Sequence, residues 1–146
     1  MNYLEEDIVA FNVTVSDAKA AIREAGELLV KGGVVEKTYV DAMVKSYEDN
    51  GPYFVIAPGV AIPHARPEDG ALESAVSLVK LKEPINFGNA ANDPVTLVFG
   101  LSASNGEEHL ATIQRIAKFL KNKETIAKLQ DIDTYESLER LKEEMS

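Results

Sequence analysis

Hydrophobic and polar positions along the chain repeat with two different periods, which divide it into strands and helices. Residues 8–15 are β-branched and aromatic, and apolar residues alternate with polar ones as in a strand. Asp17 then supplies a helix cap, apolar residues recur at helical spacing over 18–29, and a glycine pair follows at 32–33. This stretch predicts a strand followed by a helix.

The rest of the chain continues with the order α-β-β-β-α-α-α. A second helix is expected over 37–49. Short apolar runs at 53–57 and 60–62, separated by Pro58-Gly59, come next, and two better strands follow at 73–81 and 95–101. Residues 83–94 are rich in Asn, Gly and Pro and are expected to form a loop. Helical spacing then returns from residue 105, with separate helices at 124–130 and 135–145.

The strands at 73–81 and 95–101 are almost continuously apolar, which indicates a sheet covered on both faces. With helices before and after the strands, the predicted fold is α/β, a three-layer α/β/α sandwich with a central mixed β-sheet. The length of 146 residues favours a single domain spanning 1–146.

Charge and composition narrow the functional classes. Lys and Arg number 15 against 24 Asp and Glu, a net charge of −9, which argues against nucleic acid and anionic membranes as partners. The chain has no cysteine, which excludes disulfides, thiolate metal sites and a cysteine nucleophile. An acidic start and the absence of a long apolar run predict a cytoplasmic protein without direct membrane insertion.

His64 is one of two histidines and follows a short apolar run that ends in Pro63. Proline fixes its own φ and donates no backbone hydrogen bond, so His64 is expected at a stiff strand end. Arg66 adds a fixed positive charge two residues later. A rigid imidazole beside an arginine suits attack on an anionic phosphorus centre, but a histidine that only closes the turn fits the spacing as well.

The second histidine, His109, lies in the first turn of the helix predicted from residue 105. It precedes Ile113 by four positions and Ile116 by seven, so it is expected to face the buried side of the helix and the strand ends. Free N–H groups at a helix start attract anions, which two neighbouring glutamates partly oppose. A half-buried histidine with a structural role remains the alternative.

Other chemistries find less support. His64 and His109 with Asp69 or Glu107 could in principle ligate zinc, but HExxH is absent and the histidines are distant in sequence, so no metal is predicted. A Ser-His-acid hydrolase site would lack the GxSxG motif.

Taken together, the two histidine segments resemble a known family. Residues 59–64, Gly-Val-Ala-Ile-Pro-His, followed by a helix opening Glu108-His109-Leu110, resemble the enzyme IIA component of the bacterial sugar phosphotransferase system (PTS), mannitol/fructose type. The resemblance extends over nearly the whole chain. The flanking segments, GPYFVIAP at 51–58 and ARPEDG at 65–70, are similar to the L-ascorbate branch.

The resemblance implies a single PTS EIIA type-2 domain with a three-layer fold, and a phosphoryl relay without a cofactor. His64 would accept the phosphoryl group on Nε2 from the phosphohistidine of HPr. It would pass the group to a cysteine of the IIB component, which phosphorylates the sugar as it enters through the IIC permease. His109 matches the second histidine of the family, which steadies the phosphorylated one.

The mannitol-type pattern has an arginine upstream of the histidine motif, and this chain has none between Arg23 and Arg66. We hypothesise that Arg66 supplies that charge from the other side of His64. Because donor and acceptor must approach the same histidine, a fairly flat apolar docking patch is expected around it. The candidate contributors are Ala57, Pro58, Ile62 and Ala65.

Alternatives to transport remain. A regulatory domain could use phosphate on His64 as a signal to a transcription regulator, and a zinc-dependent hydrolase is a weaker third reading. Transfer of the phosphoryl group to a IIB cysteine would distinguish the first two. The choice of ascorbate over a related sugar or sugar alcohol follows from the branch resemblance alone.

Overall fold

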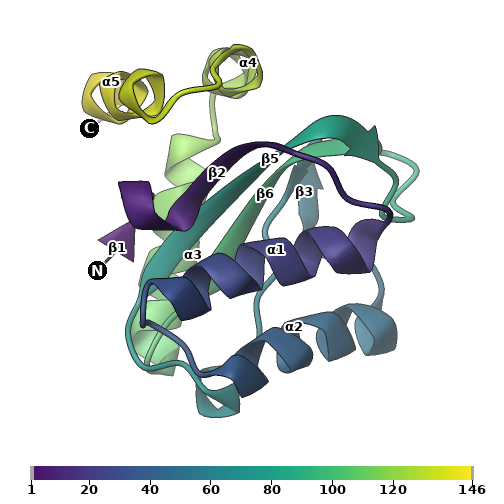
Figure 1. The fold of residues 1–146 in the computed structure, drawn as a ribbon, viewed down its shortest axis with the longest axis vertical. Coiled ribbons are helices and arrows are strands. Elements are labelled where there is room, and N and C mark those ends of the chain that lie inside the picture. The colour runs from purple at the N-terminus through teal and green to yellow at the C-terminus, as the bar shows by residue number, and fades with distance from the viewer. Residues whose placement is uncertain (1, 146) are drawn as a thin grey trace.

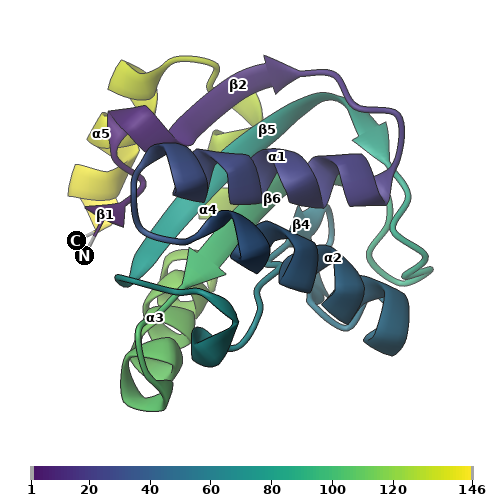
Figure 2. The same cartoon turned by 60° about the horizontal axis from the view of Figure 1, so that its bottom comes forward.

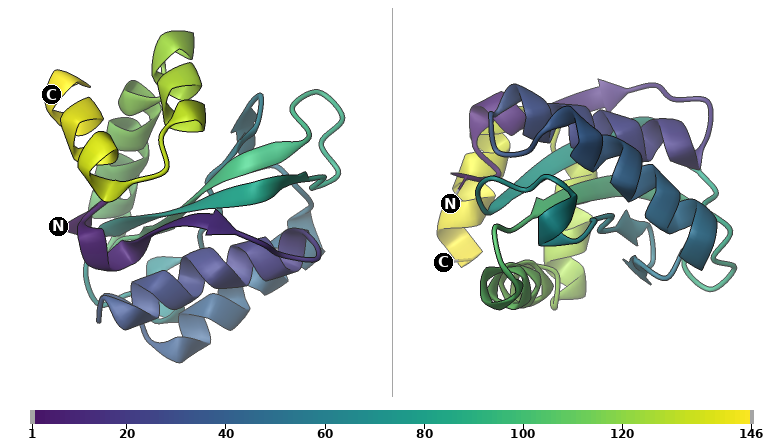
Figure 3. Two further views of the ribbon diagram at one scale, coloured as in Figure 1. Left: turned by 45° about the horizontal axis from the view of Figure 1, so that its top comes forward. Right: turned by 90° about the horizontal axis from the view of Figure 1, so that it is seen from below.

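Within residues 2–145, which the computed structural model describes, six strands form one mixed sheet with helices on both sides (Figure 1). The helices α1 (Ala18–Lys31) and α2 (Lys37–Asn50) lie on one side. The helices α3 (Gly106–Phe119), α4 (Lys123–Asp131) and α5 (Tyr135–Met145) lie on the other, as Figure 3 shows from the edge of the sheet. The predicted three-layer α/β/α sandwich with a mixed sheet is confirmed.

Two long strands form the middle of the sheet. They are β5 (Ala75–Ile85) and β6 (Val95–Ser102), which pair antiparallel and are buried at most positions. The shorter strands are β1 (Asn2–Tyr3), β2 (Val9–Val13), β3 (Val55–Ala57) and β4 (Val60–Ala61). The strands β1 and β2 both run parallel to β5, whereas β4 runs parallel to β6 and pairs antiparallel with β3.

The helical predictions are confirmed, and their caps agree with the sequence. The Asp17 carboxylate accepts a hydrogen bond from the Ala20 N–H at 2.8 Å, which satisfies one of the free donors at the start of α1. Two short 3-10 helices, η1 (Glu6–Ile8) and η2 (Pro67–Asp69), were not predicted. The α1 to α5 helices are all too short or too polar to cross a bilayer, considering the residues that the structure describes.

Two details of the prediction are wrong. Residues 83–85, expected to begin a loop, extend β5, because Ile85 still pairs with Val95 after an irregularity in the register. Leu110, assigned to the buried stripe of α3, is exposed, whereas Ile116 on the same helix is fully buried. The Leu110 side chain therefore belongs to the surface beside His109.

The topology places the ends of two parallel strands at one edge of the sheet. From β4 the chain passes through Pro63 to His64, which forms an isolated parallel bridge with Leu101 near the end of β6. From β6 it passes directly to the start of α3, where His109 lies; Figure 2 shows β6 ending beside α3. Both histidines thus meet at the carboxyl ends of β4 and β6.

Candidate functional site

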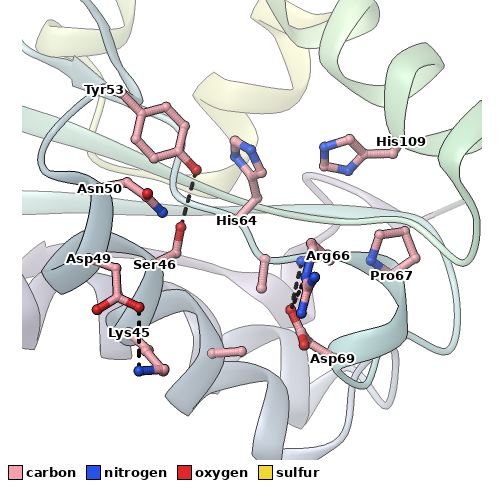
Figure 4. Close-up of a pocket in the computed structure, with 12 residues that line it drawn as sticks. Lys45, Ser46, Asp49, Asn50, Tyr53, His64, Arg66, Pro67, Asp69 and His109 are labelled. Atoms are coloured by element: carbon pink, nitrogen blue, oxygen red, sulfur yellow. Dashed lines mark hydrogen bonds and ion pairs between the residues drawn. The ribbon is translucent and has the colours of Figure 1, made fainter.

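The two histidine rings face each other across the sheet edge. Their centroids lie 5.0 Å apart and their planes are inclined by 56°. His64 extends from the segment after β4 and His109 from the first turn of α3 (Figure 4). Each side chain is half-buried, so one part of each ring packs against the protein and another part stays open to the surface. Sequence reasoning placed both residues at strand or helix ends, and the structure brings them together.

A backbone contact fixes the orientation of the His64 ring. Its Nδ1 lies 2.9 Å from the carbonyl oxygen of Ile62. A carbonyl oxygen can only accept, so Nδ1 carries the proton and Nε2 carries the free lone pair. Burial lowers the pKa of His64 below its ordinary value, and the Ile62 carbonyl opposes that shift. The ring is therefore neutral near pH 7, with Nε2 as the nucleophilic atom.

The start of α3 determines the position of His109. The Asn105 side chain caps the helix by accepting from the Glu108 N–H at 2.9 Å, and the His109 N–H donates to the Asn105 carbonyl at 2.9 Å. Burial lowers the pKa of His109, and the nearby charge that His64 would carry lowers it further. A neutral His109 retains one N–H, which can donate a hydrogen bond to an anion bound at His64.

A groove of about 560 Å³ opens in front of the two rings. Its walls are the second half of α2, Tyr53, the segment 64–67 and Asp69 (Figure 4). The Tyr53 ring meets the His64 ring edge-on, with centroids 5.9 Å apart and an interplanar angle of 84°, and its hydroxyl lies 3.2 Å from that of Ser46. The reactive side of His64 therefore faces an open groove and not an enclosed cavity.

Arg66 lines the same groove, but its charge is shared with two carboxylates. Its Nε lies 3.4 Å from Glu68 Oε1 and 3.5 Å from Asp69 Oδ2, and its side chain is 76% exposed. The backbone N–H of Arg66 also donates to Asp69 at 3.0 Å, which orders η2. A phosphoryl group on His64 would compete with these carboxylates for the guanidinium.

The predicted docking patch needs correction. Ile62 and Ala65 are only 5% and 7% exposed, because their side chains point into the core while that of His64 between them points outward. Ile62 supports the site from behind, and Ala65 contributes only a small part of the groove wall. Pro58 is exposed and Ala57 is partly exposed. The large exposed apolar side chains beside the histidines are instead Tyr53 and Leu110.

Two tyrosines near His64 were missed by the sequence analysis. Tyr39 is fully buried in α2, and its hydroxyl bonds to the backbone of Ala65 and Leu101. Its position four residues before Met43 places it on the apolar side of α2, which was the available signal. Tyr53 follows a Gly-Pro pair, and nothing in the spacing connects it with His64.

The described residues, 2–145, include no group of three or more His, Asp or Glu side chains arranged to hold a metal ion.

The α/β/α sandwich with two adjacent histidines at its strand ends is the arrangement that the resemblance implied for a phosphotransferase protein. The family profile described as "Phosphoenolpyruvate-dependent sugar phosphotransferase system, EIIA 2" matches residues 2–144. The chain belongs to this family. It is a IIA component of the sugar phosphotransferase system, and the resemblance seen in the sequence is confirmed.

Individual relatives and solved structures point to the same family. The mannitol-specific cryptic phosphotransferase enzyme IIA component of Escherichia coli (strain K12) is 35% identical over 88% of this chain and 86% of its own. The ascorbate-specific PTS system EIIA component of the same organism is 39% identical over 75% of this chain and 72% of its own. Among solved structures, IIA in the complex of enzyme IIAMtl with phosphorylated enzyme IIBMtl from Escherichia coli superimposes with a TM-score of 0.84. It is 28% identical, and the match covers 95% of this chain and 96% of that one.

Proposed function

We propose that this protein is a phosphoryl carrier that accepts a phosphoryl group on Nε2 of His64 from phosphorylated HPr and passes it to a cysteine of a IIB component. The observation that carries the proposal is the contact between His64 Nδ1 and the Ile62 carbonyl, which leaves Nε2 unprotonated and directed away from that anchor. The open groove in front of the ring gives two protein partners access to the same atom in turn.

The transfer balances without a cofactor. The Nε2 lone pair of His64 attacks the phosphorus, the N–P bond of the donor histidine breaks, and its electron pair returns to the donor nitrogen. His64 keeps its Nδ1 proton, so the phosphorylated ring has cationic character, which the Ile62 carbonyl stabilises. In the second step a IIB thiolate attacks the phosphorus, and the electron pair of the N–P bond returns to Nε2.

We assign His109 the role of stabiliser. Phosphoryl transfer depends mainly on positioning and on stabilising the charge of the phosphoryl oxygens. With its ring centroid 5.0 Å from that of His64, His109 can direct its N–H toward an oxygen of a phosphoryl group on Nε2. The lowered pKa of His109 keeps its ring neutral before transfer. The negative charge of the arriving phosphoryl group then favours the form of His109 whose N–H donates to a phosphoryl oxygen.

A IIB partner is supported by the similarity to IIA in the mannitol complex with phosphorylated IIB. HPr as donor and the IIC permease as indirect partner follow from the family resemblance. We propose L-ascorbate or a related sugar as the transported substrate, because the segments flanking His64 resemble that branch and an ascorbate-specific relative is 39% identical. We also propose that residues 1–146 act as one EIIA type-2 domain on the cytoplasmic side.

The proposal is tested by incubating the protein with phosphoenolpyruvate, enzyme I and HPr, followed by intact-mass analysis. We expect one acid-labile phosphoryl group on the wild type, none on His64→Ala, and slow acceptance by His109→Ala. Addition of a purified IIB component should then remove the group from His64. Phosphorylation of His64→Ala would refute the assignment. A phosphoryl group that persists with every IIB tested would favour the regulatory alternative.

A further inference from the structure

The hydroxyl of Tyr39 joins the segment that carries His64 to the end of β6. It accepts a hydrogen bond from the Ala65 N–H at 3.1 Å and donates to the Leu101 carbonyl at 2.7 Å. The Ala65 carbonyl lies farther away, at 3.2 Å, so the single hydroxyl proton favours Leu101. Tyr39 is completely buried in α2, so these groups are shielded from bulk water.

These bonds hold the backbone on both sides of His64. On one side, the Pro63 carbonyl accepts from the Leu101 N–H at 3.1 Å. On the other side, the Ala65 N–H is held by Tyr39. Leu101 thus takes part in both restraints, and it lies at the end of β6, from which the chain continues into α3 and His109. The Tyr39 hydroxyl therefore lies between the segment that carries His64 and the strand end that leads to His109.

We propose that Tyr39 is a positioning residue for phosphoryl transfer, whose hydroxyl fixes residues 63–65 against Leu101 and thereby sets the separation of the His64 and His109 rings. The expected effect of Tyr39 on the transfer rate rests on the proposed function. Its expected effect on the placement of the two rings does not depend on that function. Tyr39 does not line the groove and touches no reacting atom. It acts only through the backbone of Ala65 and Leu101.

The chemistry of the hydroxyl suits a permanent restraint. Burial raises the pKa of Tyr39 to about 12, with a smaller opposing effect of the Ala65 backbone. The hydroxyl therefore remains protonated at every pH at which the protein would work, and it can donate and accept at once. Phenylalanine would keep the ring in the core but leave the Ala65 N–H and the Leu101 carbonyl without this partner.

The test compares Tyr39→Phe with Tyr47→Phe. Tyr47 lies on the same helix, and its hydroxyl donates to the Phe87 carbonyl at 2.6 Å, outside the His64 segment. Each variant loses one tyrosine hydroxyl bonded to a backbone carbonyl. We expect Tyr39→Phe to slow phosphoryl acceptance from phosphorylated HPr by about 10- to 100-fold, because small displacements of reacting groups have effects of that size. Tyr47→Phe should retain the wild-type rate.

Nuclear magnetic resonance of the unphosphorylated proteins gives a second readout that loss of stability alone would not change. In Tyr39→Phe we expect a weaker cross-relaxation signal between the His64 and His109 rings and a lower fraction of the Nδ1–H tautomer of His64. Neither signal should change in Tyr47→Phe. Because these spectra need no phosphoryl transfer, they test Tyr39 even if the wild type proves not to accept a phosphoryl group.

Two outcomes would overturn the inference: histidine signals in folded Tyr39→Phe identical to those of the wild type, or equal loss of rate in both tyrosine variants. If Tyr39→Phe does not fold, an ester in place of the Ala65 backbone amide serves instead, because it removes the N–H that donates to the Tyr39 hydroxyl and keeps every side chain. We expect the same displacement of His64 in that variant, and unchanged ring signals there would equally refute the role of Tyr39.

Discussion

His64 follows strand β4 and His109 lies in the first turn of helix α3, yet their rings lie with centroids 5.0 Å apart and share one environment. Burial disfavours the charged form of each ring, and a charge on His64 further disfavours a charge on His109. The pair therefore stays neutral in a pH range where free histidines begin to take up protons. This keeps the His64 lone pair available for attack.

The first prediction concerns the pH dependence of the rate. Phosphoryl acceptance should persist below pH 6.5, the ordinary pKa of histidine, and should fall only when His64 itself protonates. The measurement is the rate of His64 phosphorylation at saturating donor, with the donor generated separately at each pH. A rate that halves at or above the ordinary histidine pKa would contradict the assignment of a lowered pKa to His64.

The second prediction concerns the effect of the lowered pKa values of His64 and His109 on the stability of the fold. Because the folded pKa values lie below those of the unfolded chain, the unfolded state binds more protons as the pH falls through about 6.5. The free energy of unfolding should therefore decrease between neutral pH and about pH 5. Urea unfolding of the wild type, His64→Gln and His109→Gln measures this. In each variant the free energy of unfolding should decrease less with falling pH than in the wild type. An equal decrease in all three proteins would contradict the prediction.

Tyr53 provides the third prediction. Its ring meets His64 edge-on at 5.9 Å, an arrangement that contributes about 0.5–1.5 kcal/mol in aromatic pairs. Tyr53→Ala should slow phosphoryl acceptance by up to roughly tenfold, whereas Tyr53→Phe should retain most of the rate because the ring remains. Tyr135→Ala on α5, another tyrosine near the surface but far from the groove, is the control. Equal rates for Tyr53→Ala and the wild type would show that the ring does not orient His64.

Much of the fold could be predicted from the sequence because local signals agree with the tertiary structure. Asp17 and Asn105 are strong helix caps, and both cap the helices expected. The near-continuous apolar runs of β5 and β6 correctly indicated a sheet with both faces covered. Local patterns could not reveal that Ile62 and Ala65 are buried, because their exposure depends on how this segment packs beside β6, to which His64 bridges at Leu101.

The site was predictable only in part. His64 and His109 stood out as the only histidines, and the family motif joined them. Their separation depends on the parallel pairing of β4 with β6, which is a contact between distant parts of the chain. The role of Tyr39 depends on the same pairing, since its hydroxyl reaches Ala65 and Leu101 only in the folded sheet. Spacing along the sequence carries no information of this kind.

The fourth prediction tests Arg66. Its exposed guanidinium is paired with Glu68 and Asp69, so its attraction to a phosphoryl group is screened by solvent and by these carboxylates. Arg66→Ala should slow phosphoryl acceptance by up to about fivefold, equivalent to about 1 kcal/mol, and added salt should reduce the difference. Arg23→Ala, which removes a similar exposed arginine paired with Asp41, should have no effect. A wild-type rate for Arg66→Ala at low salt would dismiss the hypothesis that Arg66 supplies the missing charge.

The last prediction tests the packing that supports the end of β6. Gly100 precedes Leu101, and a Cβ added there would lie 2.5 Å from Ser77 Oγ and 3.2 Å from both the Cβ and the carbonyl oxygen of Ala25. The Ser77 hydroxyl cannot move away freely, because it donates to the Ala25 carbonyl at 2.9 Å. Gly100→Ala must therefore push β6 and α1 apart, and such overpacking costs about 1–3 kcal/mol.

The matched control is Gly106→Ala at the start of α3, where a Cβ would meet nothing within 4 Å. Alanine is also the better helix former, so the free energy of unfolding should stay unchanged or rise by up to about 1 kcal/mol. Urea unfolding of the two variants beside the wild type decides the matter. If Gly100→Ala proved as stable as Gly106→Ala, the close approach of α1 to β6 would not be a rigid feature of the fold. The restraint of Leu101, on which the position of His64 depends, would then have to come from Tyr39 and Pro63 alone.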